Sequence, residues 1–371
     1  MRDDRWGPVA LVVDTAEFAG AELYLVTLVE HLRDRARFIA LVGEGSAEET
    51  GTRLADAGAE IRRVRGLSRR PTPGAVRRLA RELRRVAPAV VHANLAYQGD
   101  GLGALGARLF TGFPTVATLH LVVPGRARWR ERISGRMLRR FDRVIAVSQA
   151  VESYLMRHGV AATLVLNGLA AAHPAADPRA VLGLDGADLV VGGVGRLHEQ
   201  KGWDVLCEAA PIVRKELPTA VFAVVGDGPE REALAALGAT SDVRFVGYRP
   251  GAAALIPAFD VLAVPSRYEG LALTAVEAFY QGVPVVATNI AGLGEALGDC
   301  AVLVPPDDPA ALAAGIVRLA SDPELRADLS ARGRERAERL FSAQRMADET
   351  LAAYRAAASA RGRPGSTVGG P

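Results

Sequence analysis

Cysteine is nearly absent from this sequence of 371 residues, which contains only Cys207 and Cys300, far apart and without a C-x-x-C motif. This excludes a disulfide framework and a cysteine zinc site, and both thiols fit buried, inert positions. No apolar run reaches the roughly 18 residues of a membrane span. The short apolar run that follows MRDDRWGP lies behind two acids, unlike the core of a signal peptide. We therefore expect a cytoplasmic protein.

Aromatic residues are also scarce, at 5% of the chain, and the net charge is only +3. Arginines nevertheless concentrate in two stretches, 62–85 and 125–143. We expect no nucleic-acid binding, because no aromatic side chains interleave with these arginines as stacking platforms. Two interpretations stay open for the arginines: docking at the inner face of an anionic membrane, and solvation of basic helix faces.

Short β-branched runs alternate with longer amphipathic stretches along the chain. The runs lie at 9–14, 37–43, 59–64, 89–94, 114–120, 143–148 and 162–167, and then at 189–195, 220–226, 243–247, 261–266, 284–289 and 301–305. Repeated β–α alternation is typical of a doubly wound parallel sheet. The pattern therefore predicts an α/β protein with two Rossmann-like domains.

The break between the two series of runs lies in residues 168–188, which are rich in Ala, Pro, Gly and Asp and read as a linker. We place a first domain at 1–170 and a second domain at 171–340. The stretch 341–358 has no strand after it and could pack on its own domain or cross back to the first. The Gly/Pro/Ser-rich segment 359–371 predicts a disordered tail.

The stretch SRYEGLALTAVEAFYQGVPVVATN follows a predicted strand that ends at Ser266. A helix is predicted to begin near 273–274, and the free N–H groups of a helix start form an anion site. Gly270 allows a ligand to approach the backbone closely. Glu269 would lie in the loop and Glu277 in the first helical turn, so both could face one pocket. The alternative is that these acids only complement the helix dipole.

Two cations in VGGVGRLHEQKGWDVL are candidates for binding an anion. Arg196 follows a strand and a Gly-rich turn, and Lys201 precedes a predicted helix. Their spacing lets both converge on one phosphate group. Gly226 belongs to a further turn after the next strand, VVGDGPE, which is a weak signal alone. The alternative is a polar loop with two solvated cations.

The combination R-x4-K, GDGP and E-x7-E, each after a strand, resembles the GT-B retaining glycosyltransferases of family 4. The resemblance covers nearly the whole chain and is strongest in SRYEGLALTAVEAFYQGVPVVAT. It implies the GT-B fold, in which two Rossmann-like domains face each other across a cleft, with the acceptor side in 1–170 and donor binding in 171–340. It also implies an enzyme that moves a hexose-type sugar from a nucleotide-diphosphate sugar, most often a UDP-sugar, to a hydroxyl acceptor.

The resemblance implies catalytic roles for four residues. Arg196 and Lys201 would hold the donor diphosphate and stabilise the leaving group. Glu269 would contact the hydroxyls of the donor sugar. His120, which ends the run TVATLH, would lie near the transferred sugar, although a structural histidine is the alternative. The family's usual description is front-face substitution, in which a donor phosphate oxygen accepts the acceptor's proton, so no protein nucleophile is named.

The resemblance also implies the residues that bind the nucleotide. Glu277 would accept hydrogen bonds from the ribose hydroxyls, and the loop GYRP at 247–250 would lie against the base. The backbone around Gly20 would approach the diphosphate and sugar. The implied donor-binding residues are Gly20, Gly226, Tyr248, Arg249, Glu269, Gly270, Leu271, Ala272 and Glu277.

This chain departs from the family pattern mainly on the acceptor side. The usual double glycine is Ala19 and Gly20, and Asn94 stands where a second histidine is common. Ala170 replaces the acid that follows N-G-I. AGLGE replaces GG-x-P-E, which leaves the role of Glu295 open. These departures weaken inference about the acceptor more than inference about the donor.

No D-x-D sequence occurs in the chain, which argues against acids that hold a divalent ion on the diphosphate. We expect no metal and no cofactor besides the nucleotide sugar, because two cations can stabilise the departing charge instead. The acceptor could be a small molecule, a lipid or a glycan. Two other functions stay open: a non-catalytic two-lobed protein that binds a sugar or nucleotide, and a GT-B nucleotide-sugar epimerase.

Overall fold

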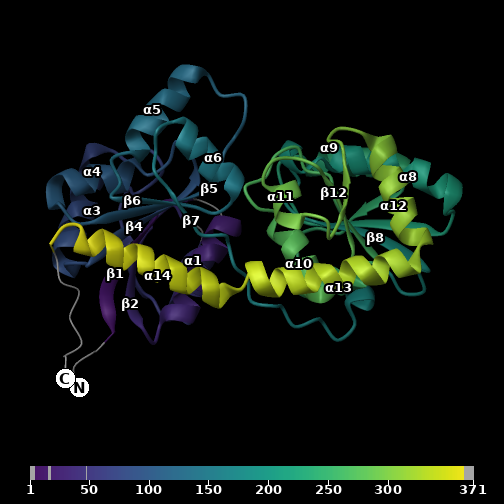
Figure 1. Cartoon of the computed structure of the whole chain (residues 1–371), viewed down its shortest axis with the longest axis horizontal. Helices are drawn as coiled ribbons and strands as arrows, with labels where there is room; N and C mark the ends of the chain where they lie inside the picture. The colour runs from purple at the N-terminus through teal and green to yellow at the C-terminus, as the bar shows by residue number, and fades with distance from the viewer. Residues whose placement is uncertain (1–4, 16–17, 47, 363–371) are drawn as a thin grey trace. The chain divides into compact units, whose positions relative to one another are not determined.

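The computed structural model describes residues 5–15, 18–46 and 48–362, which divide into two compact units (Figure 1). The first unit runs to Gly168 and also includes the last helix, whereas the second runs from Leu169 to Phe341. We had expected the divisions at 170 and 340. The expected tail, 359–371, falls mostly outside the described residues.

The first unit is built on a seven-stranded parallel sheet with the order β3-β2-β1-β4-β5-β6-β7. Its strands are β1 (Trp6–Val13), β2 (Ala36–Gly43), β3 (Glu60–Val64), β4 (Val90–Tyr97), β5 (Thr115–Leu121), β6 (Arg143–Ala146) and β7 (Thr163–Leu164). Its helices are α1 (Gly20–Leu32), α2 (Glu48–Ala57), α3 (Pro73–Val86), α4 (Leu102–Thr111), α5 (Arg128–Leu138), α6 (Gln149–Arg157) and α14 (Ala343–Ser359). The strand order reverses between β1 and β4.

Both faces of this sheet are covered by helices. Val9, Leu11 and Val13 of β1 pack into a core with α1, α2 and α14. Ala10 and Val12, which point the other way, pack into a second core with α3 to α6. Figure 1 shows α3 and α4 on one side of the sheet and α1 and α14 on the other. This two-sided burial explains why the strands read as continuous apolar runs.

The last helix, α14, packs with the first unit. Its Leu351 and Tyr354 are buried in the same core as α1. The Tyr354 hydroxyl forms a hydrogen bond with Nδ1 of the buried His92, and its ring stacks on Trp6 with the centroids 6.3 Å apart. Residues 343–359 therefore complete the first unit although they follow the second in sequence.

The second unit is built on a six-stranded parallel sheet with the order β10-β9-β8-β11-β12-β13. Its strands are β8 (Leu189–Val194), β9 (Ala220–Val225), β10 (Val243–Phe245), β11 (Val261–Val264), β12 (Val285–Thr288) and β13 (Val302–Val304). Its helices are α7 (Pro178–Leu182), α8 (Trp203–Glu216), α9 (Arg231–Ser241), α10 (Leu273–Gln281), α11 (Leu293–Leu297), α12 (Pro309–Ser321) and α13 (Pro323–Leu340), with the 3-10 helices η1 (Glu199–Lys201) and η2 (Ala252–Ala258). The two doubly wound sheets confirm the predicted fold class.

Residues 168–188, which the sequence suggested as a linker, are instead largely part of the second unit. They include α7, whose Arg179 connects the starts of two strands. The Arg179 guanidinium donates to Ala187 O just before β8 at 2.8 Å and to Oδ2 of Asp260 just before β11 at 2.8 Å. The small-residue composition of this segment thus concealed a packed connection.

Candidate functional site

Most of the predicted donor-binding residues lie in loops at the carboxyl edge of the second sheet. The strand order reverses between β8 and β11, and ligands of doubly wound sheets bind at the carboxyl ends of the strands beside such a reversal. The loop after β8 carries Arg196 and Lys201, and the loop after β11 carries Glu269. The fold therefore brings these predicted residues to the two sides of one reversal point.

Glycines let the neighbouring loops touch backbone to backbone. A Cβ on Gly226 would lie 1.9 Å from the carbonyl oxygen of Gly195. A Cβ on Gly202, whose φ is +65°, would lie 2.1 Å from the carbonyl oxygen of Pro265. No side chain fits at either position. The loop after β8 is thereby held against the loop after β9 on one side and against the loop after β11 on the other.

Lys201 and Glu269 form an ion pair across these loops. Nζ of Lys201 lies 2.6 Å from Oε1 of Glu269, and the two side chains are 18% and 6% exposed. The carboxylate also accepts hydrogen bonds from Ser266 Oγ at 2.9 Å and from Gln200 Nε2 at 3.4 Å. Glu269 therefore fixes the position of the Lys201 ammonium, a contact that the sequence did not predict.

The start of α10 lies beside this pair. The helix begins at Leu273, as predicted, and no described side chain caps its N terminus. The three preceding residues that we predicted to bind phosphate, Gly270, Leu271 and Ala272, are buried. The first turn contains no acid. An uncapped helix start with these properties favours a bound anion.

Glu277 lies deeper in α10 than predicted. It is the fifth residue of the helix and so falls beyond the first turn, where we had placed it. Its carboxylate is therefore not one that merely complements the helix dipole at the N terminus. Burial raises the pKa of Glu277 to about 7, and the charge of Lys201 opposes this shift. The carboxyl group can thus change charge near neutral pH.

The remaining predicted donor residues lie on the neighbouring loops. Arg196 is exposed in the loop after β8. The N–H of Gly226 donates to the carbonyl of Gly247 at 3.0 Å, which places the loop after β10 beside the loop after β9. Tyr248 and Arg249, the next two residues, are both exposed. Their side chains are accessible to a ligand at this edge.

The first sheet has its own reversal point, between β1 and β4, and α1 begins there at Gly20. His120 lies at the end of β5, with Nε2 2.8 Å from Oδ1 of Asn94. Since Nδ2 of Asn94 donates to Ala21 O at 2.9 Å, its Oδ1 accepts and His120 Nε2 carries the proton. Burial lowers the pKa of His120 to about 3. The imidazole is therefore neutral, with Nδ1 as its acceptor.

Two carboxyl groups at this edge were missed in the sequence. Asp14 directly follows β1, Asp100 lies in the loop after β4, and each is 7% exposed. Burial raises the pKa of Asp14 to about 7; the charge of Asp100 adds to this shift and that of Arg69 opposes it. The only sequence signal for Asp14 was its position directly after an apolar run.

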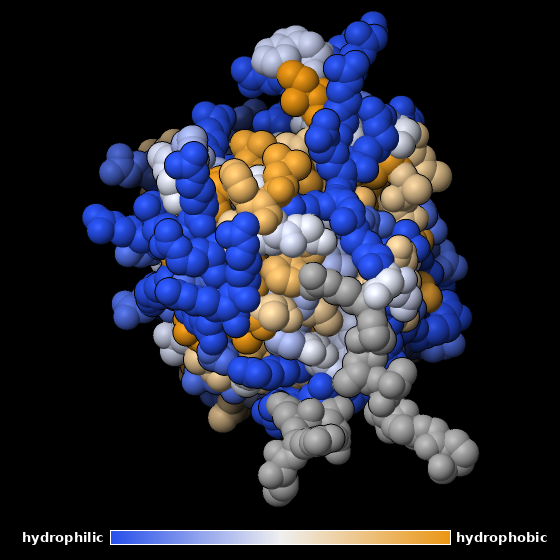
Figure 2. Space-filling view, turned by 90° about the vertical axis from the view of Figure 1, so that its left-hand side faces the viewer, coloured by the Kyte–Doolittle hydropathy of each residue, from blue (hydrophilic) through white to orange (hydrophobic). Residues whose placement is uncertain are grey.

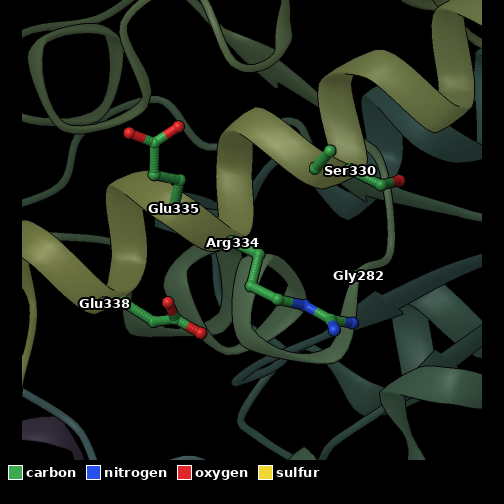
Figure 3. A pocket seen from close by; sticks show the side chains of 6 residues that line it. Gly282, Ser330, Arg334, Glu335 and Glu338 are labelled. Atoms are coloured by element: carbon green, nitrogen blue, oxygen red, sulfur yellow. The ribbon is translucent and has the colours of Figure 1, made fainter.

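A pocket of about 470 Å³ lies at the other end of α10. It is lined by Gly282, Ser330, Ala331, Arg334, Glu335 and Glu338. Figure 3 shows Arg334 reaching toward Gly282, whereas Glu335 points to the other side of α13. None of the residues predicted for the site lines this pocket, so it is separate from the loops at the carboxyl edge.

Within the described ranges 5–15, 18–46 and 48–362, no group of three or more His, Cys, Asp and Glu side chains is placed to hold a metal ion. No helix in the same part of the chain is long and apolar enough to cross a membrane. Independence from metal ions stays a prediction.

Comparisons with known proteins identify the family. Residues 18–172 match "Glycosyltransferase Family 4", and residues 188–322 match "Glycosyl transferases group 1". Glycogen synthase of Mycobacterium tuberculosis is 31% identical over 302 residues, which cover 75% of this chain and 71% of that protein. The 2-deoxystreptamine N-acetyl-D-glucosaminyltransferase of Streptomyces fradiae is 40% identical over 141 residues, or 35% of this chain and 34% of that protein.

A solved structure shares the fold. HepE of Anabaena in complex with UDP-glucose superposes with a TM-score of 0.81 at 22% identity, over 94% of this chain and 100% of that chain. This likeness and the family matches agree with the two doubly wound sheets. The chain therefore belongs to the GT-B glycosyltransferases of group 1, family 4, and is a glycosyltransferase.

Proposed function

We propose that this glycosyltransferase moves a hexose-type sugar from a UDP-sugar to a hydroxyl group of an acceptor, with retention of anomeric configuration. The observation that carries the proposal is the Lys201–Glu269 pair beside the uncapped start of α10, at the reversal point of the second sheet. An ammonium and a helix start suit a diphosphate, and a carboxylate suits sugar hydroxyls. The UDP-glucose bound by HepE supports the choice of nucleotide.

We assign the donor roles as the family resemblance implies them. Arg196 and Lys201 bind the diphosphate together with the N–H groups of residues 270–272. Glu277 accepts hydrogen bonds from the ribose, and the exposed loop with Tyr248 and Arg249 lies against the base. In the first unit, we assign neutral His120, through its acceptor Nδ1, to the transferred sugar and the backbone at Gly20 to the diphosphate.

Glu269 has two roles in this proposal. Before the donor binds, its carboxylate holds Lys201 at the reversal point. An ammonium has three N–H donors, so Lys201 can keep this contact and still bind a phosphate oxygen. The second carboxylate oxygen, which now accepts only a long bond from Gln200 at 3.4 Å, is the one we assign to the sugar hydroxyls.

The proposed reaction needs no protein nucleophile. The acceptor oxygen forms a bond to the anomeric carbon on the face from which UDP leaves, and the bond from that carbon to the phosphate oxygen breaks. The acceptor's proton passes to an oxygen of the departing phosphate. The two cations and the helix start stabilise the charge that develops on the diphosphate, which is why we propose that no metal ion is required.

Mass spectrometry of a donor panel tests the proposal. The full-length enzyme is incubated with UDP-, GDP- and ADP-hexoses, with water alone or with candidate acceptors, in the presence and absence of EDTA. We expect slow UDP release from one UDP-hexose and an unchanged rate in EDTA. Loss of all turnover in EDTA, or consumption of none of the donors, would overturn the proposal. An isomerised nucleotide sugar without UDP release would favour the epimerase instead.

The acceptor can be sought in the same experiment. The two sequence relatives are named for glycogen and for 2-deoxystreptamine, so their names indicate no single acceptor. We propose a hydroxyl-bearing acceptor that is a small molecule, a lipid or a glycan. Incubation with an extract of host metabolites, followed by a search for products heavier by one hexose, distinguishes these classes. NMR of the new anomeric centre then tests retention.

We also propose that the enzyme docks on the cytoplasmic face of an anionic membrane through α3 and α4. Large apolar side chains of α4 are exposed: Leu102, Leu109 and Phe110. Exposed arginines of α3 are Arg77, Arg81, Arg84 and Arg85. Figure 2 shows hydrophobic residues gathered on this face with hydrophilic residues on both sides. Apolar side chains that insert between lipids, flanked by arginines that pair with anionic head groups, suit such a bilayer.

Vesicle flotation tests this surface. The protein should float with vesicles that contain phosphatidylglycerol and stay unbound with pure phosphatidylcholine. The double change Leu109→Ser and Phe110→Ser should release it, whereas Val181→Ser, at a 52% exposed position of α7, should not. Equal binding of the double variant and the wild type would contradict docking through α4.

A further inference from the structure

Arg267, in the loop after β11, connects three other chain segments at the carboxyl edge of the second sheet. Its Nη1 donates to Glu199 O in the turn η1 at 2.8 Å. Its Nη1 and Nη2 grip the two carboxylate oxygens of Asp204, at the start of α8, at 3.0 and 2.7 Å. Its Nε donates to Oδ1 of Asp307, after β13, at 2.7 Å. No motif in the sequence indicated this role.

The turn η1 and the loop after β11 are also joined by contacts between successive residues, up to Lys201. The N–H of Arg267 donates to Gln200 O at 2.8 Å, and Nε2 of Gln200 donates to Tyr268 O at 3.0 Å. The ion pair between Lys201 and Glu269 follows at 2.6 Å. Successive residues of 199–201 are therefore bonded to successive residues of 267–269. The last of these contacts is the ion pair of Lys201 with Glu269.

We propose that Arg267 is a positioning residue for Lys201. Its guanidinium locks the turn η1 against the loop after β11 and thereby fixes the Lys201 ammonium where the donor diphosphate binds. Ordering this turn before the donor arrives lowers the entropy lost on binding. The role requires arginine, because only a planar guanidinium can grip both oxygens of Asp204 and also reach two other segments. The inference rests on the proposed function, in which Lys201 binds the diphosphate.

Arg179 provides a matched control in the same unit. Its guanidinium donates to Ala258 O, Ala187 O and Asp260 Oδ2 at 3.1, 2.8 and 2.8 Å. These groups precede β8 and β11, so the network lies at the amino ends of these two strands. The network of Arg267 lies at their carboxyl ends. Arg179→Met therefore removes a comparable network far from Lys201.

A double-mutant cycle on nucleotide affinity tests the proposal. Calorimetry measures the Kd of the full-length enzyme for whichever of UDP, GDP and ADP binds the wild type best. We expect Arg267→Met to weaken binding about tenfold in the presence of Lys201 and by less than about twofold when Lys201 is already Ala, because the coupling needs the ammonium. Arg267→Lys should recover only part of the affinity, and Arg179→Met should leave it unchanged.

The outcomes separate the inference from the function on which it rests. Equal losses with and without Lys201, or an unchanged Kd in Arg267→Met, would overturn the positioning role. Wild-type protein that binds none of the three nucleotides, or Lys201→Ala with unchanged affinity, would overturn the proposed function instead. If Arg267→Met fails to fold by circular dichroism, Asp204→Asn loosens the same grip without a change of size and takes its place in the cycle.

Discussion

The carboxyl edges of the two sheets are built in different ways. On the second sheet, entire loops touch through their backbones, at Gly226 and Gly202, and the Lys201–Glu269 pair spans the reversal point. On the first sheet, single polar side chains from separate strands meet, as with His120 and Asn94. The donor side is a set of interlocked loops, whereas the first edge is a set of isolated buried groups.

This difference explains why the loops of the second edge leave a motif in the sequence and most groups of the first edge do not. A loop that must approach a phosphate needs glycines and cations at fixed spacing, which leaves a motif in the chain. A single buried acid such as Asp14 leaves none, because Asp100, whose charge acts on it, lies in the loop after a different strand. The interlocked loops of the second edge and the single groups of the first edge should therefore respond differently to substitution.

The largest effect should come from Glu269→Gln, at the centre of the interlocked edge. The neutral amide cannot form an ion pair with the Lys201 ammonium and leaves this partly buried cation without its carboxylate. We expect kcat/KM for donor consumption to fall roughly a hundredfold or more, measured by initial rates of UDP release.

Glu295→Gln is the control, since Glu295 is exposed on α11 and its role was left open by the sequence. It should keep a rate close to that of the wild type. If Glu295→Gln lost as much activity as Glu269→Gln, the segments after β11 and β12 would both contribute to donor consumption, contrary to the site described above.

The next effect should come from Gly202→Ala, which drives a Cβ into the carbonyl oxygen of Pro265. The free energy of unfolding should fall by roughly 3–4 kcal/mol, from the positive φ and the clash together. Gly183→Ala, with nearly the same φ of +64° but nothing within 4 Å, should cost only about 1 kcal/mol. Urea unfolding followed by circular dichroism measures both. Equal costs would show that the contact between the loops contributes nothing.

The fold could be predicted because strands buried on both faces read as unbroken apolar runs. Strand β1 illustrates this, with apolar side chains in both cores. The limits of that signal appear at β7, where the run 162–167 yields a strand of only two residues. This strand lies at the sheet edge and pairs with β6 alone, at Thr163 and Leu164. Apolar character marks burial but does not fix how far pairing extends.

The contacts that shape the site could not be predicted. Lys201 and Glu269 are 68 residues apart, and nothing in either loop states how far the other reaches. The grip of Arg267 on Asp204 is equally distant in sequence. Glu277 was assigned to the wrong turn because a helix start near 273–274 leaves it at the boundary between the first and second turns. Motifs therefore indicated candidate residues, and the packing of the loops determined their partners.

A pH series on Glu277→Gln tests the buried carboxyl group of the donor side. Since burial raises the pKa of Glu277 to about 7, the folded state favours the protonated form. Its contribution to stability is full at low pH and is lost as pH rises through about 7. The unfolding free energy of the wild type should therefore fall from about pH 5 to 8 by about 2–3 kcal/mol more than that of the variant. The pKa of Asp14 is also raised to about 7. Because Asp14 titrates in both proteins, its contribution cancels in the comparison.

If the unfolding free energies of Glu277→Gln and the wild type change in parallel with pH, this prediction is wrong, and the carboxylate stays ionised beside Lys201. The comparison also bears on the donor. If the ribose hydroxyls bind the ionised form, nucleotide affinity should rise with pH through the same range in the wild type and remain flat in the variant.

The smallest effect should come from the first edge, through Asn94→Ala. This change removes the Oδ1 acceptor of His120 and leaves its buried Nε2–H without a partner, which should lower the free energy of unfolding by about 1–2 kcal/mol. Asn289→Ala, at an exposed position, is the control and should have no effect. Because His120, the partner of Asn94, is assigned to the transferred sugar and not to the nucleotide, nucleotide affinity should stay unchanged while stability falls. A loss of nucleotide affinity in Asn94→Ala would instead mean that the bond from Asn94 Nδ2 to Ala21 O supports the diphosphate contact proposed for Gly20, and the distinction between the two edges would fail.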